Sequence, residues 1–270
     1  MDLEREQERQ TYRLCRAGFA ILSFALGVAC LTTLLALPRL FGVRALVPLL
    51  QNSALWSWVD VPIVWGSLVG TYLLWGRWNN PHWQRRAGLL VMMGTVDVVL
   101  WLLEHGGSLG LRTDEIGHLW LRGNLGQALG WAEFALMASL SCEVLVHLGV
   151  PQAAETGRAT RSLAGTGAVI WMLFFCETTN WQTWPLVFKR PTLQSLLLDL
   201  GSTMIWTITL IQVTALTIAT ARQCGAVLQE MDREDDEQDP LKSASVRDRR
   251  FSAGDRGAVT DRDRPDSTRS

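Results

Sequence analysis

Charged residues are scarce in the middle of this 270-residue chain. Positions 17–222 hold only 10 acidic and 12 basic residues, about half the density of charge in an average soluble domain. Such a segment is too apolar to form the surface of a water-soluble protein, so we expect an integral membrane protein. The other charges lie in residues 1–16 and after position 222.

Motifs of catalysis and cofactor binding are also lacking. The 5 cysteines are scattered without a CxxC pair, so neither a disulfide framework nor a thiolate metal site is indicated. No P-loop, GxGxxG, HExxH or GxSxG pattern occurs, and no internal repeat indicates an inverted-repeat transporter. The sequence favours a protein that is not an enzyme, leaves any cofactor unknown, and gives no sign of nucleic-acid binding.

Long apolar runs occupy the segment that lacks charge. A helix of about 20 apolar residues spans a bilayer, and continuous runs favour an all-α fold, a polytopic transmembrane helical bundle. The fifth run is the weakest, and a re-entrant segment is its alternative. The six expected spans lie at about 17–37, 55–75, 87–105, 125–150, 162–180 and 193–221.

The distribution of arginine predicts the orientation of these spans. The segment before the first span has four Arg and the loop after the second has three, whereas the loops after the first, third and fifth spans carry two basic residues each. The loop after the fourth span has two Arg, and Arg222 follows the sixth. Because basic flanks stay in the cytoplasm, both termini are expected there, and the first run is expected to be retained rather than cleaved. Arg outnumbers Lys 23 to 2, which fits a GC-rich genome and favours a bacterial inner membrane.

The segments outside the spans have distinctive compositions. The charged segment 223–270 has very few large aliphatic residues, so it cannot bury enough apolar surface to offset chain entropy. We expect a disordered tail, which either solubilises the protein or docks a partner. The loops 38–53 and 113–122 mix apolar and charged residues and are expected to lie on the membrane surface.

Tryptophan is unusually frequent, with 13 residues. Indole combines an apolar ring with a polar N–H and therefore gathers at membrane–water interfaces. We interpret most of these residues as aromatic belts, with ligand stacking as the alternative for the outer belt. The outer belt comprises Trp56, Trp58, Trp120, Trp181 and Trp184, and the inner belt comprises Trp75, Trp78 and Trp83.

Two GxxxG patterns predict close helix packing. Gly66 and Gly70 lie in the second span, and Gly126 and Gly130 lie in the fourth. Two glycines on one helical face let another backbone approach closely. Packing within the bundle is the simpler interpretation, and homodimerisation is the other. The expected partners are the lipid bilayer and either a second copy of the chain or another subunit of a membrane complex.

Acidic residues inside the spans are the most informative feature. All 12 basic residues of the segment lie in loops or at span ends, so we expect no salt-bridge partner for these acids. A charged carboxylate at the bilayer centre costs about 2.5–3.5 kcal/mol, so each acid must be protonated, hydrogen-bonded, hydrated or bound to a cation. The seven acids are Asp60, Asp97, Glu104, Glu133, Glu143, Glu177 and Asp199.

Helical periodicity places polar residues on shared faces. Glu133, Glu143 and His147 lie within about 80° of arc on the fourth span. The second, third and sixth spans offer similar stripes, the sixth through threonines that include Thr214 and Thr217. We expect these stripes to face a common interior. Five carboxylates are predicted to fall in one outer layer: Asp60, Glu104, Glu133, Glu177 and Asp199.

These observations favour a small cation- or proton-coupled transport or permeation protein. The residues expected to bind the ion or proton are Asp97, Glu133, Glu143, Asp60 and Asp199. A non-catalytic membrane scaffold or accessory subunit is the alternative. A third hypothesis is an intramembrane metal-dependent enzyme, although the histidines lack an HxxxH pair. Its candidate metal ligands are Glu104, His105, Glu177 and His147.

Overall fold

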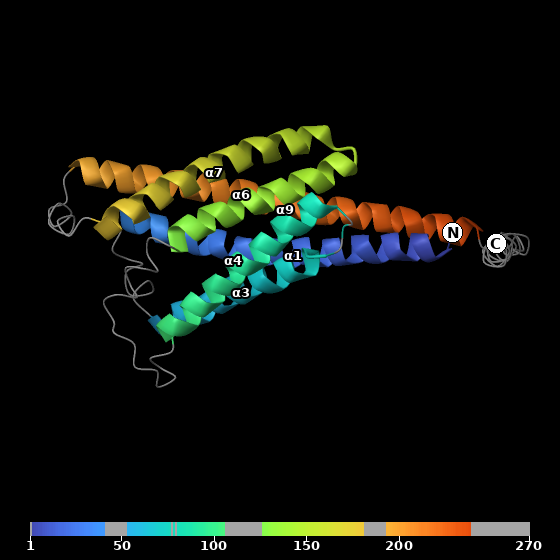
Figure 1. The fold of residues 1–270 in the computed structure, drawn as a ribbon, viewed down its shortest axis with the longest axis horizontal. Coiled ribbons are helices and arrows are strands. Elements are labelled where there is room, and N and C mark those ends of the chain that lie inside the picture. The colour runs from blue at the N-terminus through green and yellow to red at the C-terminus, as the bar shows by residue number, and fades with distance from the viewer. Residues whose placement is uncertain are drawn as a thin grey trace, which may run out of the picture. The chain divides into compact units, whose positions relative to one another are not determined.

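A computed structural model describes residues 2–40, 53–76, 78, 80–105, 126–180 and 193–238 of the chain. It divides into one unit at Met1–Gly225 and a second at Ala226–Ser270. Within the described ranges the chain forms helices and no strand, which confirms the all-α prediction (Figure 1). The helices are α1 (Asp2–Leu40), α3 (Ser53–Leu74), α4 (Pro81–His105), α6 (Gln127–His147), α7 (Pro151–Asn180) and α9 (Leu193–Gln238).

Three helical segments of the described chain are long and apolar enough to cross a membrane. They are Glu4–Leu35 in α1, Gln127–His147 in α6 and Thr203–Asp235 in α9. The segment Trp58–Leu74 of α3 is a shorter apolar helix. Large apolar side chains are exposed on these helices, which suits contact with lipid rather than with water. The apolar helices therefore indicate a membrane protein.

Helices α6 and α7 form a helical hairpin whose turn is closed by glycine. Gly149 has a φ of +72°, a conformation that glycine adopts without steric cost. The N–H of Val150 donates to the carbonyl of Leu145 at 2.9 Å, and the N–H of Gly149 donates to that of Val146 at 3.1 Å. This pattern is a Schellman motif, and Pro151 then starts α7. The two helices are consequently held side by side (Figure 1).

Helices α3 and α4 form a second hairpin, and Asn80 caps the start of α4. The Asn80 side-chain oxygen accepts a hydrogen bond from the N–H of His82 at 2.9 Å, and Pro81 occupies the first helical position. Trp83 is fully buried and donates its ring N–H to the carbonyl of Leu74 at 3.0 Å. The interpretation of Trp83 as a belt residue is therefore wrong, because its ring fills the space between two helix ends.

Glycines bring α1 and α3 into close contact. A Cβ atom on Gly70 would lie 2.7 Å from Leu22 Cγ, and one on Gly18 would lie 2.9 Å from the carbonyl oxygen of Gly70. One turn earlier on α3, a Cβ on Gly66 would lie 3.1 Å from the Cβ of Ala25. The first GxxxG pattern thus faces another helix of the same chain, where a side chain would force the backbones apart.

The described helices extend beyond two of the expected boundaries. Residues 223–238, which the composition assigns to a disordered tail, continue α9. This stretch is rich in helix-forming residues and is free of proline until Pro240. Residues 162–180, the weakest expected span, lie inside the continuous helix α7. Residues 239–270, the loop 113–122 and most of the loop 38–53 lie outside the described residues.

Candidate functional site

Two of the predicted acids line one cavity inside the first unit. The cavity has a volume of about 240 Å³ and is walled by side chains of α1, α3, α4, α6 and α9. Asp97 enters its lining from α4 and Glu133 from α6. Ser67 of α3 also lines it, so the polar stripes of three helices meet at this cavity. We expected the polar stripes to face a common interior, and one residue from each of three stripes lines this cavity.

Glu133 is almost completely removed from solvent. Its exposed fraction is 6%, and its carboxylate oxygen Oε1 has no hydrogen-bond partner in the structure. Among the described residues that line the cavity there is no arginine or lysine. Two carboxylates that line one cavity repel each other when both are charged. The pair of acids is therefore suited to hold a proton or an external cation.

A glycine positions an aromatic ring against this cavity. Gly130 lies about one turn before Glu133 on α6, and a Cβ there would lie 2.7 Å from Cη2 of Trp206. The absence of a side chain lets the Trp206 ring of α9 reach α6. Trp206 and Phe134 then pack with ring centroids 4.7 Å apart, and both line the cavity beside Glu133. Gly126, the first glycine of the pattern, is also part of the lining.

A second cavity, also of about 240 Å³, shares two lining residues with the first. Gln127 and Trp206 line both cavities, and Trp131, Trp171 and Thr203 complete the second. Trp131 and Trp206 meet edge to face, with ring centroids 5.0 Å apart. Sequence reasoning missed these mid-helix tryptophans because it assigned the residue type to membrane interfaces. The available signal was the position of Trp131 two residues before a buried acid.

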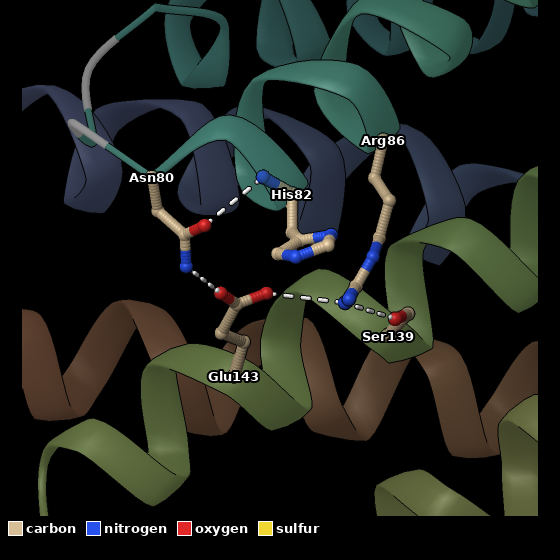
Figure 2. A network of polar contacts seen from close by, with 5 residues as sticks. All are labelled: Asn80, His82, Arg86, Ser139 and Glu143. Carbon is tan, nitrogen blue, oxygen red and sulfur yellow. Dashed lines mark hydrogen bonds and ion pairs between the residues drawn. The ribbon is translucent and has the colours of Figure 1, made fainter.

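Glu143 lies in a separate polar network, which Figure 2 shows. Its Oε2 forms an ion pair with Arg86 Nη1 at 3.1 Å, and its Oε1 accepts a hydrogen bond from Asn80 Nδ2 at 2.8 Å. Arg86 also donates to the hydroxyl of Ser139 at 2.9 Å. Asn80 thus caps the start of α4 with its side-chain oxygen and links α4 to α6 through its side-chain nitrogen.

The expectation that no buried acid has a basic partner is wrong for Glu143. Arg86 lies before the start of the expected third span, but α4 begins earlier, at Pro81. The first turns of α4 therefore face the last turns of α6, where Glu143 lies. The carboxylate is neutralised within the protein, so Glu143 does not share the environment of Glu133.

His147 packs in an aromatic cluster at the end of α6. Its ring meets Trp78 edge to face with centroids 5.1 Å apart, and Trp78 also packs against Tyr12 and Trp83. Within the described ranges no three His, Cys, Asp or Glu side chains form a group that could hold a metal ion. The described part of the chain thus gives no support to a metal centre.

The remaining predicted residues are placed only in part. Asp60 is half-buried on α3 and is not among the residues that line either cavity. The other candidates lie on described helices, but their side chains are outside the described residues: Glu104, His105, Glu177 and Asp199.

Three threonines of α9 hydrogen-bond to their own helix backbone, whereas Thr203 lines the second cavity. Thr207, Thr214 and Thr217 each donate a hydrogen bond to a carbonyl three or four residues earlier. Such bonds satisfy hydroxyl groups within a helix and leave little need for a polar partner. What α9 contributes to the Asp97–Glu133 cavity is Trp206 and Leu210.

Comparisons with protein-family models, with curated proteins and with solved structures find no match to the chain.

Proposed function

We propose that the protein is a small membrane transport or permeation protein, coupled to a cation or to protons, with the site at Asp97 and Glu133. The observation that carries the proposal is the cavity shared by these two acids, in which Glu133 is buried and its Oε1 finds no hydrogen-bond partner among the described residues. Ionisable groups inside membrane helices mark ion and proton pathways in many transporters. A purely structural acid would be expected to have its oxygens paired.

The proposal includes six membrane-crossing helices with both termini in the cytoplasm. Support comes from α4, which is not one of the three long apolar segments found among the described residues but exposes a stripe of large apolar residues along one face. A lipid-facing helix carries such a stripe at a helical repeat. The stripe comprises Leu89, Met92, Val96, Val99 and Leu102.

The proposal is tested with the purified full chain in sealed liposomes that contain a pH-sensitive dye. A potassium gradient with valinomycin drives proton uptake, and sodium and potassium fluxes are followed with radioactive tracers in separate liposomes without valinomycin. We expect flux through the unsubstituted protein and its loss in Glu133→Gln, with a comparable loss in Asp97→Asn. The matched control is Glu155→Gln, because Glu155 is an exposed acid of α7 outside both cavities.

Two outcomes would contradict transport. One is the absence of any ion flux above that of empty liposomes. The other is a flux that has the same rate in Glu133→Gln, Asp97→Asn, the Glu155→Gln control and the unsubstituted protein. Each variant is first compared with the parent by size-exclusion chromatography and thermal unfolding, so that a loss of flux is not confused with a loss of fold.

A further inference from the structure

The walls of the Asp97–Glu133 cavity combine negative charge with aromatic surface. Besides the two acids, Phe134, Met137 and Trp206 line it, and its described lining contains no basic residue. Aromatic faces attract cations through the quadrupole of the ring, and tryptophan does so most strongly. Carboxylates beside an indole ring therefore favour a ligand that carries a positive charge on an apolar body.

The same walls are poorly suited to an inorganic divalent ion. Calcium takes six to eight oxygen ligands, and magnesium requires a nearly octahedral set. The hydroxyls of Thr32 and Thr33, which line the cavity, both donate to the carbonyl of Ala29. The cavity also has the side-chain oxygens of Ser67 and Gln127, but no third acid, histidine or cysteine of the described residues joins the two carboxylates, and the rings of Phe134 and Trp206 supply no ligand.

The aromatic wall is held in position by its neighbours. Trp206 packs against Phe134 with an interplanar angle of 46° and against Trp131 at 88°. Gly130 lies under one end of its ring, and Gly167 of α7 lies so close to Trp131 that a Cβ there would be 2.5 Å from the indole. A ring fixed on two sides loses little conformational freedom when a ligand binds.

We propose that the ligand is a small organic ammonium ion, bound with its charged nitrogen near Asp97 and Glu133 and its alkyl groups against Trp206 and Phe134. This inference rests on the proposed transport function and names its substrate class. The volume of about 240 Å³ is below the range of about 300–1,000 Å³ that holds drug-sized ligands, so the ion is small. Protonated amines and quaternary ammonium ions share the required chemistry.

The test is calorimetric titration of the full chain in lipid nanodiscs with tetramethylammonium chloride at constant ionic strength. We expect saturable binding that sodium and magnesium chlorides do not displace at equal concentration. Trp206→Leu should weaken binding by about three- to thirtyfold because it removes the aromatic face, whereas Trp206→Phe should retain most of it. Trp58→Phe is the control, since Trp58 is 77% exposed and lines neither cavity.

Three results would overturn the inference: no saturable binding of tetramethylammonium, displacement by sodium or magnesium at equal concentration, or unchanged binding in Trp206→Leu. Trp206→Phe keeps the test decisive if the leucine variant does not fold, since retained binding in a folded phenylalanine variant together with weakened binding in Glu133→Gln would support the site. If protons or sodium cross the membrane but tetramethylammonium does not bind, the organic ammonium ligand is refuted and the transport proposal stands. If tetramethylammonium binds but no ion, including tetramethylammonium itself, crosses the membrane, the transport proposal is refuted and the binding site stands.

Discussion

Two acids on one helix have opposite environments. Glu133 and Glu143 are ten residues apart on α6, yet Glu143 is paired with Arg86 and Asn80, whereas Oε1 of Glu133 has no hydrogen-bond partner in the part of the chain that the structure describes. The difference arises from the neighbouring helix, because the start of α4 supplies polar groups to Glu143 and its middle supplies Asp97 to the cavity of Glu133. At the residue scale, these partners separate a structural acid from a candidate functional one.

The Arg86–Glu143 pair should stabilise the contact between α4 and α6 by about 1 kcal/mol, because its side chains are 35% and 28% exposed and thus partly screened by solvent. The variants to compare are Arg86→Gln, Glu143→Gln and the double variant that carries both substitutions. We expect each single variant to lower the thermal unfolding temperature in detergent and the double variant to lose less than the sum. Additive losses would mean that the pair does not contribute.

The control for this cycle is Arg85→Gln. Arg85 is the neighbouring residue of α4, carries the same charge and is exposed. Its substitution should leave the unfolding temperature within the error of the parent. A loss equal to that of Arg86→Gln would show that net charge, rather than the ion pair, determines the stability of this helix end.

At the scale of elements, glycines determine how closely the helices approach. Gly70→Ala adds a methyl group 2.7 Å from Leu22 Cγ and 3.0 Å from the carbonyl oxygen of Gly18. Because a backbone oxygen cannot move aside without shifting α1, we expect a destabilisation of about 1–3 kcal/mol, measured as thermal or denaturant unfolding in detergent.

Gly27→Ala is the matched control on α1. A Cβ at Gly27 would meet nothing within 4 Å, so the substitution tests helix propensity alone. Alanine favours a helix over glycine by about 1 kcal/mol, and the variant should be as stable as the parent or more stable. Equal effects of Gly27→Ala and Gly70→Ala would contradict close packing of α1 against α3.

A second pair of glycines tests the aromatic wall. Gly167→Ala should displace the Trp131 ring, because the new Cβ would lie 2.5 Å from Cδ2 and Cε3 of the indole. Gly165 lies on the same helix with nothing within 4 Å of its Cβ position. We expect Gly167→Ala to change the near-ultraviolet circular dichroism of tryptophan and to lower stability, and Gly165→Ala to do neither. Matching spectra for the two variants would show that α7 does not support this ring.

The sequence predicts the helices well, because their apolar runs extend continuously over the length of a bilayer. It also predicts that polar stripes of neighbouring helices meet, as Ser67, Asp97 and Glu133 do. It fails where the outcome depends on which helix faces which. The partner of Glu143 and the inward position of Trp206 are contacts between segments distant in the chain, which local periodicity does not specify.

For the molecule as a whole, the number of crossings determines where the termini lie. Six crossings return the C-terminus to the side of the N-terminus. If only α1, α6 and α9 crossed, the termini would lie on opposite sides, and the turn between α3 and α4 would lie outside. Because basic residues flank the expected cytoplasmic ends, we favour the arrangement with six crossings.

Fusions and cysteine labelling in intact cells distinguish these arrangements. We expect fluorescence from green fluorescent protein fused after Ser270 and no activity from alkaline phosphatase fused there, since each reporter works on one side of the membrane only. His82→Cys places a thiol on an exposed position beside the α3–α4 turn. A membrane-impermeant maleimide should label it only after the cells are opened, with the unsubstituted chain as the control for the native cysteines. Active phosphatase at the C-terminus, or labelling of His82→Cys in intact cells, would exclude six crossings with cytoplasmic termini.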